Sequence, residues 1–399
     1  MQIEKFLSLK SNSPVNQNSP FKESKEAISS VCIIGGGLAG LTAAIHLAQK
    51  KIDVVLFEKN NYPKHKVCGE YVSNEVLPYL NSLGIDVFEH GAKKIYNLNL
   101  SHQNGKTLEQ QLPLGGFGIS RYALDRLLAE KAKEKNVNII HDEVLSIDFI
   151  NDSFQITSKE QHIHANFVIC AHGKRSGLDK TLDREFIHEK TPWIGIKAHY
   201  KSKKFNENLV ELHNFQGGYC GLSMVENGHI NLCYLVHQKE FKKFKSIEKF
   251  NQHGLTDNPY LKSFLEQAEP AFEKHLSISQ ISFQNKPTVK NHVFFAGDAA
   301  GLIHPLCGNG MAMAIHSAKL ISEEIVLFFN STHKSRKAVE QAYQKKWEYH
   351  FKKRLFYGKV IQKILLHPKL SSTLINLISG SPFLLKQIIK QTHGKPIDA

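Results

Sequence analysis

The apolar positions of the chain follow strand and helix periods in alternation, which predicts a mixed α/β fold. Residues 31–34 form an uninterrupted apolar run that is typical of a buried strand. Apolar residues then recur at helical spacing over 38–49, and a second apolar strand occupies 53–57. Strand, helix and strand in this order predict a βαβ unit with a parallel sheet.

The rest of the pattern predicts elements in two groups. The first comprises a helix over 75–83, paired strands over 96–100 and 107–112, a helix over 120–136, strands over 137–140 and 143–150, a hairpin over 154–164 and a buried strand over 166–171. The second alternates like an antiparallel sheet over 193–200, 209–213, 219–225 and 230–236, with one helical stretch near 247–269. A buried strand from Val293 and a helix over 311–328 follow.

The turn after the first strand carries a G-x-G-x-x-G pattern. Gly35 permits a tight turn, Gly37 lets backbone amides approach a pyrophosphate, and Gly40 lets helix and strand pack closely. The helix N-terminus adds partial positive charge, and Glu58 after the second strand can accept hydrogen bonds from a ribose. A glycine-rich turn alone occurs in ordinary α/β units, but all these features in order predict a nucleotide-cofactor site.

A second glycine motif follows the strand that begins at Val293. Asp298, after Gly297, lies at the tip of that strand and can bind another diol of the cofactor. Gly308 and Gly310 open the next helix, whose N-terminus can face an anion or a ring that carries negative charge. Together with the first turn, this motif favours FAD over NAD.

Two further stretches point to the same cofactor. Ser120 can cap a helix that starts with Arg121, an unfavourable residue for a helix N-terminus unless an anion or an acidic partner is near. The loop over 61–73 follows the second strand, so Cys68, Gly69 and Glu70 are candidates for the cofactor's surroundings. The alternative for this loop is a surface connection.

These motifs resemble those of the FAD-dependent oxidoreductases that unite aromatic hydroxylases and geranylgeranyl reductases. The tract 67–73 is similar to the Cys-x-Glu-x-x-Ser loop of geranylgeranyl reductases. The resemblance implies a Rossmann-like FAD-binding domain with an inserted antiparallel β-sheet substrate domain and a C-terminal helical tail. The candidate cofactor-binding residues are Gly35, Gly37, Leu38, Ala39, Gly40, Glu58, Lys59, Cys68, Glu70, Arg121, Val144, Gly297, Asp298, Gly308, Gly310 and Met311.

The expected domain boundaries follow from these patterns. They are a disordered leader over 1–29, a discontinuous FAD-binding domain over 30–90, 118–182 and 287–330, a substrate domain over 91–117 and 183–286, and a basic C-terminal helical region over 331–399. A sheet inserted into a nucleotide-binding fold usually forms the wall over the reactive end of the cofactor. The expected reductant is NAD(P)H or another reduced electron carrier.

Two departures from the resemblance leave the reaction open. Geranylgeranyl reductases carry a Tyr-x-Trp-x-Phe-Pro pattern on the substrate sheet, of which residues 219–224 keep only the tyrosine. The hydroxylases have Asp-Gly where His172 and Gly173 stand here. Because the tract 67–73 resembles that of geranylgeranyl reductases, we expect reduction of carbon–carbon double bonds in a prenyl-lipid, quinone or polyketide-like substrate. The alternatives are hydroxylation of an alkylated aromatic, as suggested by similar flavoproteins found beside type III polyketide synthases, and a non-catalytic flavin-binding module.

Four side chains are candidates for proton transfer or redox contact. Cys68 could contact the substrate as a thiol, and Tyr219, His304 and Lys197 could exchange a proton with it. Each residue also has an ordinary structural interpretation, as a packed or hydrogen-bonded side chain. No metal-ligand spacing joins the six cysteines and the many histidines.

Composition and charge add the cellular setting and a hypothesis about partners. The six cysteines lack a C-x-x-C pair, no apolar segment approaches the roughly 18 residues that span a bilayer, and no signal peptide is evident, so a reducing cytoplasm is expected. Residues 331–399 hold 14 Lys/Arg against 3 Asp/Glu, or +11 of the net +14. No nucleic-acid recognition motif accompanies this charge.

The basic C-terminal region is patterned as amphipathic helices. Tyr343, Trp347, Phe351, Leu355 and Phe356 recur at helical spacing among lysines, and shorter apolar helices are expected over 370–378 and 383–389. Such helices can lie on an anionic membrane, at the inner face, and admit a lipid-like substrate. The alternative is that the apolar stripe packs against the protein with its lysines solvated.

Overall fold

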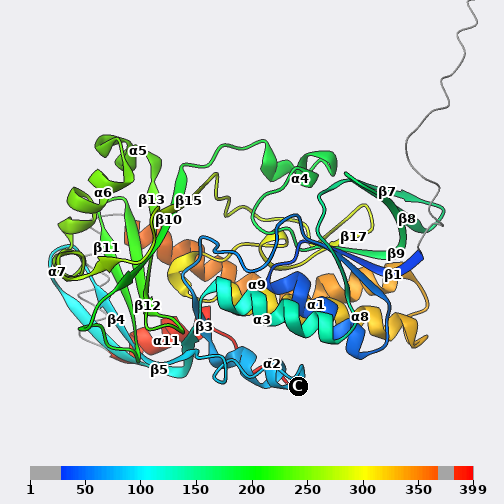
Figure 1. Ribbon diagram of the computed structural model, residues 1–399, viewed down its shortest axis with the longest axis horizontal. Helices are drawn as coiled ribbons and strands as arrows, with labels where there is room; N and C mark the ends of the chain where they lie inside the picture. The colour runs from blue at the N-terminus through cyan, green and yellow to red at the C-terminus, as the bar shows by residue number, and fades with distance from the viewer. Residues whose placement is uncertain (1–27, 367–381, 399) are drawn as a thin grey trace, which may run out of the picture.

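The computed structural model describes residues 28–366 and 382–398, which form a mixed α/β protein built on two sheets (Figure 1). Sheet A lies at one end of the long axis and sheet B at the other. Four helices lie in a row beside sheet A, where α1 contacts α3 and α8, and α8 contacts α9. Their bounds are α1 Leu38–Gln49, α3 Arg121–Glu134, α8 Gly310–Phe329 and α9 Arg336–Leu366.

Sheet A contains the predicted βαβ unit. Its strand order is β16-β17-β9-β1-β2-β6, with a β7–β8 hairpin added through β8. The bounds are β1 Ile28–Ile34, β2 Val54–Phe57, β6 Asn138–Ile140, β7 Val144–Ile150, β8 Ser153–Ser158, β9 His162–Cys170, β16 Val289–Lys290 and β17 Val293–Phe295. β17, β9, β1, β2 and β6 are parallel, so their carboxyl ends share one edge.

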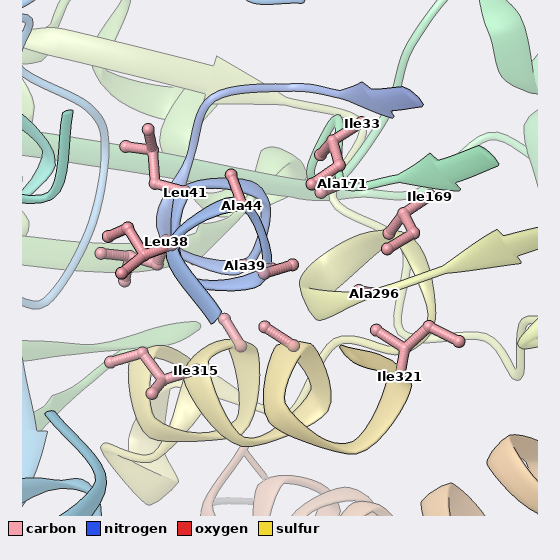
Figure 2. Packing of buried hydrophobic residues seen from close by; sticks show 14 of the residues in the cluster. Ile33, Leu38, Ala39, Leu41, Ala44, Ile169, Ala171, Ala296, Ile315 and Ile321 are labelled. Atoms are coloured by element: carbon pink, nitrogen blue, oxygen red, sulfur yellow. The ribbon is translucent and has the colours of Figure 1, made fainter. Parts of the chain in front are cut away.

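Small residues let α1 pack closely between sheet A and α8. Figure 2 shows Ala39 of α1 pointing towards Ala296, with Ile315 and Ile321 of α8 packed below the helix. A Cβ on Gly40 would overlap the carbonyl oxygen of Gly35, which explains the third glycine of the motif. Gly297 has φ +62°, and a Cβ there would come 3.0 Å from the Cβ of Ala39. Both glycine motifs therefore depend on this tight packing.

Sheet B has the order β14-β10-β13-β12-β11-β4-β5-β3, with β15 also paired to β10. The bounds are β3 Tyr71–Ser73, β4 Lys93–Ser101, β5 Thr107–Gly118, β10 Trp193–Lys201, β11 Leu209–Phe215, β12 Gly218–Met224, β13 Ile230–His237, β14 Glu269–Pro270 and β15 Leu276–Ser279. Its pairings are antiparallel except for β4 with β11. α6 (Ile247–His253) and α7 (Pro259–Gln267) pack on it around the buried Phe250.

Three predicted elements differ from the structure. The single helical stretch over 247–269 is two helices, because Asn258 accepts hydrogen bonds from the start of α7 and Pro259 occupies its first position. The second arm of the predicted hairpin and the buried strand after it are one strand, β9. β3 falls in the segment assigned to the cofactor domain, yet it pairs with β5 of sheet B.

The C-terminal helices pack onto the body of the protein. Tyr343, Trp347 and Phe351 of α9 are buried, and the Tyr343 hydroxyl donates a hydrogen bond of 2.6 Å to the carbonyl of Phe295. α11 (Pro382–Thr392) contacts α9 and β5. The helix expected over 370–378 lies outside the described residues. Within 28–366 and 382–398, no helix is long and apolar enough to cross a membrane.

Candidate cofactor and substrate site

One cavity extends from the carboxyl edge of sheet A to the inner face of sheet B. The volume of this cavity is roughly 330 Å³. The predicted site residues that line it are Gly37, Leu38, Ala39, Cys68, Glu70, Arg121, Tyr219, Gly297, Asp298, Gly308, Gly310 and Met311. Residues that are far apart in the sequence therefore meet, because the parallel strands deliver both glycine motifs to the same edge.

The cofactor end of this cavity fits FAD. The N-terminal residues of α1 and α8 line it, and neither helix has a side-chain cap or an acidic residue in its first turn. An anion is favoured at such helix ends. A Cβ on Gly37 would lie 3.5 Å from Nη2 of Arg121, so glycine keeps the approach between this turn and the guanidinium open.

Glu58 holds the first glycine turn and does not line the cavity. Its carboxylate accepts hydrogen bonds from Gly36 N (2.8 Å), Asn60 N (3.0 Å) and Asn60 Nδ2 (2.7 Å). Tyr62 covers the same turn and donates to the carbonyl of Gly36 at 2.7 Å. Since a carboxylate has about four acceptor positions, Glu58 retains capacity for a ribose hydroxyl.

Arg121 belongs to a cluster with more positive than negative charge. It forms two hydrogen bonds of 2.8 Å with Asp125, which also pairs with Lys66 at 2.9 Å. Burial opposes ionisation of Asp125, but the charges and hydrogen bonds of Arg121 and Lys66 outweigh it and lower its pKa. Two cations thus share one carboxylate beside Gly37, which leaves net positive charge where a pyrophosphate would bind. Asp125 also supplies the acidic partner that Arg121 required.

Glu70 is the centre of a fully buried ionic network. Its carboxylate accepts hydrogen bonds from Arg121 N (2.6 Å), His199 Nε2 (2.7 Å) and Lys197 Nζ. Burial raises the pKa of Glu70, yet Lys197 and His199 reverse that effect and lower it overall. His65, Glu70 and His199 lie close enough to share a metal ion, but the Lys197 ammonium already neutralises the carboxylate. Lys197 therefore serves this ion pair and does not line the cavity.

The loop that carries Cys68 is anchored to sheet B by hydrogen bonds. It is therefore not the simple surface connection that was the alternative. Asn231 Nδ2 donates to the carbonyls of Cys68 (3.1 Å) and Gly69 (2.8 Å), and Ser223 Oγ donates to that of Gly69 at 3.3 Å. These contacts hold Cys68 at the cavity wall. Ser223 and Asn231 were not among the predicted site residues, although they are polar residues within the apolar strands β12 and β13, which is a usable signal.

Besides Glu58, Lys197, Gly35 and Gly40, three further predicted residues do not line the cavity. His304 stacks on Phe283 at 3.9 Å between ring centroids, and burial lowers its pKa to about 3. Lys59 is exposed and pairs with Glu143, and Val144 is buried in β7. His304 is thus a packed neutral histidine, and the structure gives Lys59 and Val144 no contact with the cavity.

Tyr219 remains positioned for a role at the substrate. It lines the cavity, and its hydroxyl oxygen accepts a hydrogen bond from Leu306 N at 3.2 Å. Burial raises its pKa well above the ordinary value, so the phenol keeps its proton near neutral pH. His172, at the position where hydroxylases have Asp, pairs with the buried Asp179 at 3.1 Å.

The far end of the cavity is apolar and lies between sheet B and α11. Its apolar lining residues from the strands are Leu98, Leu100, Leu108, Leu112, Val210, Leu212, Leu222 and Leu235. Leu385, Ile388 and Ile389 of α11 form the opposite wall. Apolar walls of this kind bind a hydrophobic molecule. The sequence pattern assigned α11 to the basic C-terminal region and did not predict this wall.

Comparison with known proteins agrees with the site. The model of a family described as "FAD binding domain" matches residues 29–343. The conditioned medium factor receptor 1 of Dictyostelium discoideum is 23% identical over 93% of this chain and 78% of its own length. A digeranylgeranylglycerophospholipid reductase of Methanosarcina acetivorans is 25% identical over 79% of this chain and 80% of its own length.

Solved structures share the fold at low sequence identity. A flavoprotein/dehydrogenase from Cytophaga hutchinsonii superposes with a TM-score of 0.77 at 15% identity and covers 92% of both chains. A flavin-dependent brominase gives 0.75 at 18% identity over 92% of this chain and 93% of its own. With the family match spanning most of the chain, the protein belongs to the FAD-binding domain family and is an FAD-dependent oxidoreductase.

Proposed function

We propose that the protein reduces carbon–carbon double bonds of a hydrophobic substrate with a prenyl, quinone-like or polyketide-like chain. The observation that carries this proposal is the single cavity in which the flavin end and the apolar end are continuous. An extended apolar chain could lie along sheet B with one double bond at the cofactor. The name of the relative from Methanosarcina acetivorans, a reductase of a prenylated phospholipid, supports this substrate class.

The reaction needs a hydride and a proton, one for each carbon of the double bond. FAD, reduced by NAD(P)H or another carrier, would supply the hydride. The buried Tyr219 phenol is a candidate proton donor, because its oxygen already accepts from Leu306 N and its own proton is available to the substrate. Asn231 and Ser223 keep Cys68 at the wall, and the leucines of sheet B exclude water.

Product mass tests the proposal directly. Anaerobic turnover of a geranylgeranyl lipid should add two hydrogen atoms per reduced double bond. With deuterated reductant, the product should carry deuterium at one carbon of that bond. Tyr219→Phe should lower kcat and leave FAD content unchanged, whereas Tyr96→Phe, at an exposed tyrosine of β4, should change neither. Absence of reduced product from prenyl, quinone and polyketide-like substrates alike would refute the proposal.

A second candidate is hydroxylation of an alkylated aromatic. Its support is that Ser101, Glu211 and Asn214 of sheet B also line the cavity, where the Glu211 carboxylate, bonded to His213 through one oxygen, could accept from a phenol through the other. In that case the product would gain one oxygen atom and turnover would require O₂. A product that incorporates one ¹⁸O atom when turnover is run under ¹⁸O₂ would favour hydroxylation over reduction.

A further inference from the structure

The two faces of α9 are both aromatic, and only one of them is buried. Tyr349 is 81% exposed, Phe356 61%, Val360 37% and Tyr357 36%. Spacings of seven and four residues bring Tyr349, Phe356 and Val360 onto one side of the helix, with Tyr357 at its edge. We call these four side chains the outer aromatic face. It lies opposite Tyr343, Trp347 and Phe351, which pack into the protein, so of the predicted apolar stripe these three are turned inward and Phe356 is exposed.

Lysines surround the outer aromatic face. By helical spacing, Lys345, Lys346, Lys352, Lys353 and Lys363 lie on the same side of α9. Acidic residues are few here: Glu348 pairs with Lys352 at 3.4 Å, and Lys346 pairs with Glu324 of α8. The wider segment 331–399 carries a formal charge of +11. An anionic partner complements this surface, whereas a second copy of the chain would bring +11 against +11.

Helix α9, which carries the outer aromatic face, and helix α11 also form walls of the cavity. Ile361 of α9 and Leu385, Ile388 and Ile389 of α11 line it, and Phe383 at the start of α11 is 66% exposed. α9 runs along the long axis towards the sheet B end (Figure 1). The outer aromatic face and Phe383 thus belong to the helices that wall the apolar part of the cavity.

We propose that the outer aromatic face and Phe383 dock on the surface of an anionic phospholipid bilayer. Aromatic side chains at this depth enter the interface between headgroups and acyl chains, while long lysine side chains reach the phosphates. The helix then lies in the plane of the membrane, with its inner stripe still packed on α8. Docking concerns lipid binding alone and does not depend on the reaction proposed above.

Vesicle co-sedimentation of the FAD-loaded protein tests this surface without any substrate. Binding to phosphatidylcholine vesicles should require added phosphatidylglycerol and should weaken with salt. Tyr349→Ser/Phe356→Ser/Val360→Ser should reduce binding by about tenfold, as should Lys352→Glu/Lys353→Glu. The matched controls are Leu145→Ser/Ile150→Ser, at exposed apolar positions of β7, and Lys203→Glu/Lys204→Glu, on the loop after β10. Both control variants should bind within about twofold of the original protein.

Three results would overturn the proposal. They are equal binding to neutral and anionic vesicles, undiminished binding by the outer-face variants, and a dimer in solution that becomes monomeric in those variants. The last result would assign the face to contact between two copies. An unchanged flavin absorbance spectrum in each variant shows that loss of binding does not reflect misfolding.

Discussion

Replacing Glu70 by glutamine tests whether the buried network holds the cofactor loop in place. Glu70→Gln preserves shape but leaves the Lys197 ammonium, which is fully buried, without its counter-ion. Removing one partner of a buried ion pair costs about 3–5 kcal/mol of the free energy of unfolding. An amide oxygen at the Oε1 position can still accept from Arg121 N, and the amide NH2 at the other position can donate to neutral His199 Nε2, so we expect the lower part of that range, about 3 kcal/mol.

A double-mutant cycle separates this charge effect from simple packing loss. Lys197→Met removes the orphaned ammonium, so Glu70→Gln/Lys197→Met should be more stable than the sum of the single changes by about 2 kcal/mol or more. Urea unfolding of the FAD-loaded protein, followed by circular dichroism, measures each free energy of unfolding. The ion-pair interpretation would be wrong if the two single substitutions changed the free energy of unfolding additively. It would also be wrong if the free energy of unfolding of Glu70→Gln lay within about 0.5 kcal/mol of the original value.

Three further outcomes are expected. Gly37→Val should weaken FAD binding by about tenfold or more in a fluorescence titration, because its side chain would enter the space beside Arg121, whereas Gly177→Val, where an added Cβ meets nothing, should not. Glu70 and Asp125 have lowered pKa values, so their ionised forms stabilise the folded protein fully above about pH 5. This stabilisation is lost as pH falls through the folded-state pKa values. A thermal unfolding midpoint that stayed constant down to about pH 3 would contradict this expectation. Leu385→Trp should raise the KM for a long-chain substrate and leave FAD affinity unchanged, and the same KM for long and short chains would argue against an α11 wall.

The cofactor half of the fold could be predicted because its determinants are local. The strand–helix–strand order over 31–57 and the glycines of both motifs are dictated by steric fit over a few residues. Once the strands are parallel, their carboxyl ends must share an edge, so the two motifs meet. Mixed α/β architecture and FAD as cofactor follow from that part of the sequence, and the structure and the family match bear out both.

The contacts of Glu70 could not be predicted from the sequence, because they depend on the tertiary structure. Lys197 and His199 are 127 and 129 residues away along the chain, and their shared face on β10 was the one local signal that they act together. α9 shows the same difficulty, since it has aromatic residues on both sides. Which side is buried depends on the shape of α8 and β17, with which Tyr343 packs, and no periodicity within α9 encodes that choice.

We propose that one cavity brings a hydrophobic substrate to reduced flavin. Anaerobic stopped-flow mixing of the reduced protein with a geranylgeranyl lipid tests it most directly, with flavin absorbance as the signal. We expect oxidised flavin to return rapidly, at a rate that depends on lipid concentration and is lower in Leu385→Trp. Flavin that stays reduced with every prenyl, quinone and polyketide-like substrate, and reoxidises only when oxygen is admitted, would contradict it.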